Sequence, residues 1–141
     1  ANKRINEIFS EEQLKNARVL RVTNPYTSLL INDGKGNFTI QALPIEAQYS
    51  PIFGIETLDY NHDGKLDILL AGNNSTYRLR IGKMDANQGV VLRGKGKLQF
   101  EYVPQQQSGL QLHGDVKDIK QIGNSLIFSI NNQQVAVYKS Q

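Results

Sequence analysis

The sequence contains no cysteine and no tryptophan among its 141 residues. The lack of cysteine excludes disulfide bonds, thiolate catalysis and zinc sites with cysteine ligands. No apolar run approaches the roughly 20 residues that a transmembrane helix requires, so we expect no membrane span. The 16 basic and 13 acidic side chains are scattered along the chain, and their net charge of +3 is too weak to indicate nucleic-acid binding.

The N-terminus, Ala1-Asn2-Lys3-Arg4, has neither a methionine nor an apolar signal region. We therefore expect a processed or truncated piece of a longer chain. The length and the hydrophobic content of 39% fit a single domain, residues 1–141, with one core.

One short helix is expected within the N-terminal segment, residues 1–16. Ser10 stands at an N-cap position, and Gln13 three residues later completes a capping box. Glu11 and Glu12 fall in the first turn, where they favour the positive end of the helix dipole. We expect this helix to end near Asn16 and to cover part of a sheet or its edge.

From Ala17 onward, the pattern is typical of an all-β domain, because many short apolar stretches are separated by Gly, Asn and Pro turns. The Asn-Gly-rich residues 32–37 and the turn Gly94-Lys95-Gly96 predict two hairpins. The predicted strands are residues 19–22, 29–31, 38–43, 52–59, 67–72, 90–92, 98–102, 116–122, 126–130 and 135–138.

Three landmarks recur about 60 residues apart. The hairpin at residues 28–38 recurs at 89–100, residues 54–58 are echoed by 115–119, and residues 69–74 by 127–132. A period of this size with four strands per unit favours propeller blades that pack face to face. A chance match between two β-rich stretches is the alternative.

The most specific chemistry lies in the nine residues Asp59-Tyr60-Asn61-His62-Asp63-Gly64-Lys65-Leu66-Asp67. A tight loop turns alternate side chains inward, and Gly64 permits the sharp turn. The predicted ligands are the side chains of Asp59, Asn61, Asp63 and Asp67 with the backbone carbonyl of Lys65.

An all-oxygen ligand set suits calcium, whereas magnesium, which keeps several waters and a stricter octahedron, is the weaker candidate. The loop is not an EF-hand, because Leu70 stands at position 12 and an apolar strand follows. His62 is expected to point outward. A polar Asp/Asn/Gly turn without metal is the remaining alternative.

Residues 50–54, the loop 59–67 and the strand 68–72 together resemble an FG-GAP/VCBS repeat, the repeat that forms the blades of integrin-type β-propellers. The hairpins at 31–38 and 92–97 resemble the same family, and residues 17–138 are similar to the C-terminal end of bacterial VCBS-repeat proteins related to cartilage acidic protein. The resemblance implies calcium ligands at Asp59, Asn61, Asp63, Lys65 and Asp67. It implies no metal in the next unit, where residues 120–125 lack a carboxylate.

The resemblance also implies an all-β partial β-propeller of about two to three antiparallel four-stranded blades. Residues 17–52 and 113–141 would be partial blades, and residues 53–103 a complete calcium-binding blade. Related whole propellers have six or seven blades, so we expect the isolated chain to self-associate or to belong to a longer propeller.

The expected function is that of a calcium-binding structural or interaction module in an extracytoplasmic protein, with a protein or glycan partner. Calcium-dependent carbohydrate binding is the alternative. No enzyme activity is expected, because His113 has no recognisable triad context. The lysines Lys35, Lys65, Lys95 and Lys97 are expected at the calcium end. The recognition candidates at the opposite end are Tyr49, Tyr77, Arg78 and Arg80.

Overall fold

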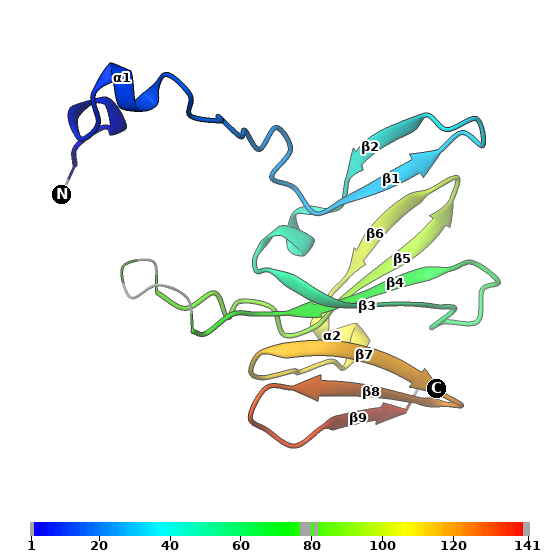
Figure 1. The fold of residues 1–141 in the computed structure, drawn as a ribbon. Helices are drawn as coiled ribbons and strands as arrows, with labels where there is room; N and C mark the ends of the chain where they lie inside the picture. Colours follow the sequence, from blue (N-terminus) through cyan, green and yellow to red (C-terminus); the bar gives the residue numbers. More distant parts are fainter. Residues whose placement is uncertain (1, 77–79, 81, 140–141) are drawn as a thin grey trace.

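The computed structural model describes residues 2–76, 80 and 82–139. The described part of the chain is mostly β, with antiparallel sheets of two, four and three strands. The sheets lie side by side in chain order (Figure 1). The predicted β-rich, antiparallel architecture is therefore confirmed.

Each sheet is a meander in which sequential strands are neighbours. The first sheet pairs β1 (Ser28–Asn32) with β2 (Phe38–Ala42). The central sheet contains β3 (Ile52–Leu58), β4 (Asp67–Gly72), β5 (Val90–Gly96) and β6 (Gln99–Val103). The third sheet contains β7 (Val116–Ile122), β8 (Ser125–Ile130) and β9 (Ala136–Lys139).

The central sheet is covered on both faces, and β4 is buried along its whole length. Successive side chains of a strand point to opposite faces. Leu69 and Ala71 accordingly join the core shared with the third sheet, whereas Ile68 and Leu70 join the core shared with the first. A continuous apolar run is the expected pattern for a strand buried on both faces.

The packing between the central and third sheets centres on β7, which lies against β3 and β4. Phe128 of β8 is fully buried in the same core. Its ring meets that of Tyr138 on β9 edge to face, with centroids 5.6 Å apart. Edge-to-face pairs of this kind add to the stabilisation from burial alone.

The N-terminal segment forms η1 (Ile5–Glu7) and α1 (Glu11–Leu14). The predicted capping box is confirmed, because the Ser10 N–H donates to Gln13 Oε1 at 2.9 Å and the Gln13 N–H donates to Ser10 Oγ at 3.3 Å. The prediction that this helix covers a sheet is wrong, since none of its residues is buried and it lies away from the sheets (Figure 1). A single turn with one large apolar residue, Leu14, offers too little apolar surface to pack.

Two further short helices, η2 (Ile45–Gln48) and α2 (Gln105–Ser108), lie in connections where the sequence predicts loops. The predicted strand at residues 19–22 is wrong, and the first strand begins at Ser28. Residues 18–23 form no hydrogen bond with another described residue. An extended segment needs a neighbouring strand to become part of a sheet, and here it has none.

The turn between β5 and β6 also differs from the prediction. β5 continues through Gly96, and the turn is made by Lys97 and Leu98, whose φ angles are 52° and 59°. Two successive residues with positive φ are typical of a type I′ hairpin turn. Gly94 thus lies within the strand.

Candidate metal site

The loop between β3 and β4 brings together the three side chains that the alternating pattern places inside it. The carboxylate of Asp59 accepts hydrogen bonds from the backbone N–H groups of Asp63 (3.0 Å) and Gly64 (2.8 Å). The Asn61 side chain donates to Asp63 Oδ2 at 3.2 Å, and its Oδ1 accepts from the Asp63 N–H at 3.3 Å. Asp59, Asn61 and Asp63 therefore share one hydrogen-bonded loop.

The loop reverses direction through two residues in the left-handed region, His62 with φ 57° and Gly64 with φ 79°. Glycine adopts this conformation without steric cost, so Gly64 suits the position. The Lys65 N–H then donates to Asp63 Oδ1 at 2.9 Å, which closes an Asx-turn.

Asp67, the predicted closing ligand, begins β4 and is fully buried. Its Oδ2 accepts from the Tyr60 N–H at 3.0 Å, and its Oδ1 accepts from the Gly94 N–H at 2.7 Å. Hydrogen bonds to an ionised carboxylate are stronger than those between neutral groups. Asp67 thus fastens the loop to β5.

Gly94 belongs to this site, although its sequence context predicts a turn. A Cβ atom at residue 94 would lie 2.2 Å from the carbonyl oxygen of Leu66. Only glycine lets β5 come close enough for the hydrogen bond to Asp67. A glycine inside a strand often marks such a close backbone approach, and this signal could have identified it.

Hydrogen bonds and charges around the loop favour the ionised form of Asp63. The hydrogen bond from Asn61, with smaller contributions from the Lys65 N–H and ammonium group, holds the pKa of Asp63 below its ordinary value. Lys65 Nζ lies 3.5 Å from Asp63 Oδ2, and both groups are partly exposed. On the neighbouring hairpin, Arg93 and Lys95 both pair with Glu101. Lys95 is the main cause of the lowered pKa of Glu101, followed by Arg93.

The candidate metal ligands of the loop are carboxylate, amide and carbonyl oxygens. Within the described part of the chain, no group of three or more His, Cys, Asp or Glu side chains surrounds one point. The carboxylates instead cap backbone N–H groups. Each carboxylate oxygen that accepts one backbone hydrogen bond keeps a second lone pair, which can still coordinate a metal ion. An oxygen-only donor set of this kind fits a hard cation such as calcium.

The hairpin between β1 and β2 offers an internal comparison, because it repeats the Asp-Gly-Lys sequence at Asp33. Asp33 Oδ1 accepts from the N–H groups of Lys35 (2.7 Å) and Asn37 (3.1 Å), and the Asn37 side chain is the main cause of its lowered pKa. The same Asx-turn therefore forms around one carboxylate. The additional carboxylates Asp59 and Asp67 distinguish the β3–β4 loop from a simple polar turn.

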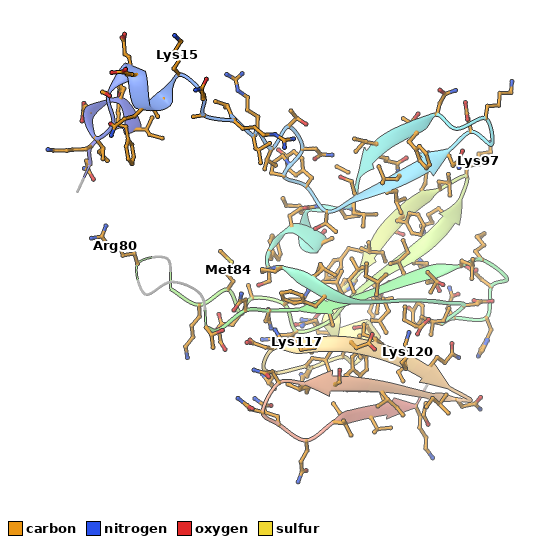
Figure 2. The ribbon with its side chains drawn as sticks, viewed as in Figure 1. Lys15, Arg80, Met84, Lys97, Lys117 and Lys120 are labelled. Carbon is orange, nitrogen blue, oxygen red and sulfur yellow. The ribbon has the colours of Figure 1, made fainter. Side chains whose placement is uncertain are left out.

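The predicted recognition residues are only partly described. Tyr49 is 56% exposed, and Arg80 is exposed, whereas Tyr77 and Arg78 lie outside the described residues. Figure 2 shows Arg80 and Lys97 on opposite sides of the molecule. The structure thus places Tyr49 and Arg80 on the surface.

Across the described ranges, none of the helices has the length and apolar character needed to cross a bilayer. No family model, no curated protein and no solved structure matches the chain.

Proposed function

We propose that the chain is a calcium-binding, non-enzymatic β-sheet module of the FG-GAP/VCBS type, which serves a structural or interaction role in an extracytoplasmic protein. The observation that carries the proposal is the hydrogen-bonded loop of Asp59, Asn61 and Asp63, which Asp67 links to β5. The ion would be held by these four side chains and by the Lys65 carbonyl. When bound, calcium neutralises the mutual repulsion of the three carboxylates.

The position of the loop explains how such a site would stiffen the fold. The loop joins the ends of β3 and β4, and the Asp67–Gly94 hydrogen bond links it to β5. Holding the loop rigid therefore holds three strands of the central sheet. The side-by-side meander sheets, with the central one covered on both faces, support a segment of a β-propeller.

Thermal unfolding with and without calcium tests the proposal. A ligand that binds only the folded state adds about 2.7 kcal/mol at 100 times its Kd, which corresponds to a Tm increase of about 10 °C for a domain of this size. We expect Asp63→Ala to lose most of this increase. Asp33→Ala, which removes the carboxylate of the matched Asx-turn, keeps it. An equal increase in wild type and Asp63→Ala contradicts the assignment.

Calcium-dependent carbohydrate binding is the second candidate. A depression of about 200 Å³ beside the start of β5 is lined by two tyrosines, Tyr49 and Tyr102, and by the polar side chains of Glu46, Gln88 and Gln105. Aromatic faces beside polar groups suit a sugar ring. A glycan array on the calcium-loaded protein tests this function, and binding that persists after chelation excludes the calcium-dependent form.

A further inference from the structure

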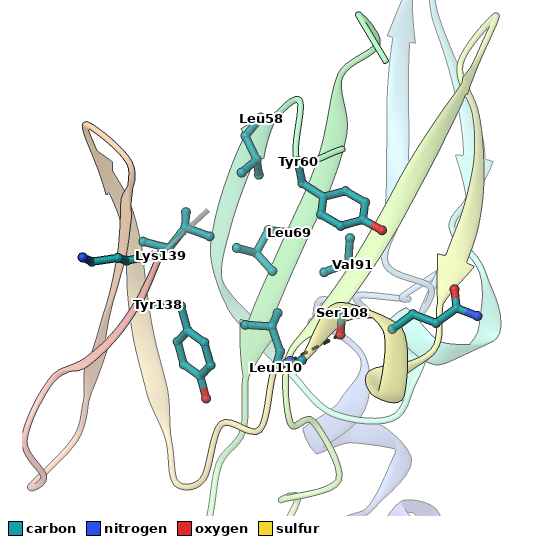
Figure 3. Close-up of a pocket in the computed structure, with 11 residues that line it drawn as sticks. Leu58, Tyr60, Leu69, Val91, Ser108, Leu110, Tyr138 and Lys139 are labelled. Carbon is teal, nitrogen blue, oxygen red and sulfur yellow. Dashed lines mark hydrogen bonds between the residues drawn. The ribbon is translucent and has the colours of Figure 1, made fainter. Parts of the chain in front are cut away.

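The third sheet has one strand fewer than the central sheet, so the outer edge of β9 is open within the described residues. A cavity of about 330 Å³ lies between the two sheets (Figure 3). Its apolar lining includes Leu58, Leu69, Val91, Leu110 and Leu126, and β9 contributes Tyr138 and Lys139. A strand added to β9 would find hydrogen-bond partners along the edge and apolar surface beside it.

The chain carries a segment with matching properties, residues 17–23, called here the N-terminal arm. Its residues 18–23 form no hydrogen bond with another described residue. Val19, Leu20 and Val22 are 74%, 77% and 84% exposed. In an extended chain, Leu20 and Val22 share one face and Val19 lies on the other. The arm therefore has free backbone groups and an apolar face.

The inward face of β9 offers two positions for this apolar face. Ala136 and Tyr138 pair with Phe128 and Leu126 of β8 and pack against the core between the sheets. An antiparallel strand beside β9 would place Val22 next to Ala136 and Leu20 next to Tyr138. Both side chains would then lie on the cavity side.

We propose that the N-terminal arm of one copy adds to β9 of a second copy as the fourth strand of its third sheet, with Leu20 and Val22 directed into the cavity. Two copies can exchange arms reciprocally and form a dimer. This inference depends on the strand order and the arm, and it stands apart from the proposed calcium site.

The reach of the chain excludes the arm's own β9 as its partner. The arm enters β1 of the first sheet, and the central sheet separates the first sheet from the third (Figure 1). Two sheet-to-sheet spacings amount to about 20 Å. The connection from Val22, the last paired residue of the arm, to Ser28 spans at most about 22 Å when fully extended, which leaves too little length for a path around the central sheet. A second copy has no such constraint.

The size of the exchanged segment sets the expected affinity. β9 has four residues, which limits the paired length to about 14 Å, and a reciprocal exchange with a contact about 10 Å wide buries about 560 Å² in total, which is typical of a weak, transient interface. We therefore expect a monomer–dimer equilibrium that depends on concentration. Sedimentation velocity over a concentration series of the full chain measures it.

Two matched substitutions test which face of the arm makes the contact. Leu20→Asp places a charge on the inward face and should abolish the dimer, whereas Val19→Asp places it on the outward face and should leave the dimer intact. Both side chains are exposed in the single chain, so neither change should alter its circular dichroism. A chain that stays monomeric up to about 1 mM, or a dimer that survives Leu20→Asp, overturns the proposal.

Disulfide trapping tests the partner strand directly, because the native chain has no cysteine. A mixture of two single variants, Val22→Cys and Ala136→Cys, should form a mixed disulfide dimer under mild oxidation. A mixture of Val19→Cys and Ala136→Cys should form far less. Equal trapping in the two mixtures, or no trapping in either, contradicts the pairing with β9.

Discussion

The replacement of Gly94 by alanine tests the link between the candidate metal loop and the sheet. The new Cβ atom would lie 2.2 Å from the Leu66 carbonyl oxygen, and ordinary contacts begin at 3.4 Å. The backbones of Leu66 and residue 94 must therefore separate by about 1.2 Å, the difference between these distances. The 2.7 Å hydrogen bond from the Gly94 N–H to the buried Asp67 carboxylate cannot survive a separation of this size.

The expected loss follows from two contributions. Overpacking costs about 1–3 kcal/mol, and the loss of a hydrogen bond to a charged group costs about 1.5–3 kcal/mol. The free energy of unfolding should fall by about 4 kcal/mol, with a Tm decrease of about 10–15 °C. Denaturant and thermal unfolding followed by circular dichroism measure both quantities, and the Tm increase with calcium should also shrink.

Gly36→Ala is the matched control. Gly36 has open space around it and a φ of +90°, so alanine there meets only backbone strain, which costs about 1–2 kcal/mol. It should leave the calcium effect unchanged. A free energy of unfolding of Gly94→Ala within about 1 kcal/mol of the wild-type value would refute the steric conflict with Leu66, because overpacking alone would cost more.

Further predictions concern acid stability, a buried carboxylate and the core. Side-chain hydrogen bonds lower the pKa values of Asp33, Asp63 and Glu101, so their contribution to stability is complete above about pH 4.5 and is lost as the pH falls through the lowered values. Unfolding free energies measured from pH 6 to pH 2 should therefore decrease, and an increase would contradict the assigned hydrogen bonds. Asp115 is buried and accepts three hydrogen bonds from the backbone N–H and the hydroxyl of Ser75, in the loop after β4. Asp115→Ala should therefore lower the free energy of unfolding in urea by about 1–3 kcal/mol. An unchanged free energy would show that other contacts hold this loop. Phe128→Ala should cost about 3–5 kcal/mol, and a loss below 1 kcal/mol would place Phe128 outside the core.

Much of the strand pattern could be predicted from the sequence, because most strands are bounded by Gly, Asn or Pro turns. The predicted bounds of residues 67–72 and 116–122 coincide with β4 and β7. The capping box of Ser10 and Gln13 also forms as predicted, since it depends only on neighbours three residues apart.

The wrong predictions concern features that distant parts of the chain decide. The arm at residues 17–23 has the pattern of a strand, yet none of the described strands pairs with it. Gly94 has the sequence context of a turn, yet its role depends on the backbone of Leu66, the residue before β4, which lies next to Gly94 of β5. The burial of Asp67 likewise comes from strand packing.

The most direct test of the calcium proposal is a calorimetric titration of the metal-free chain with calcium chloride at pH 7. We predict one binding event per chain for the wild type and for Asp33→Ala, and none for Asp63→Ala. A wild-type titration that shows no binding at millimolar calcium, or an unchanged titration of Asp63→Ala, would contradict the assignment of the β3–β4 loop as a calcium site.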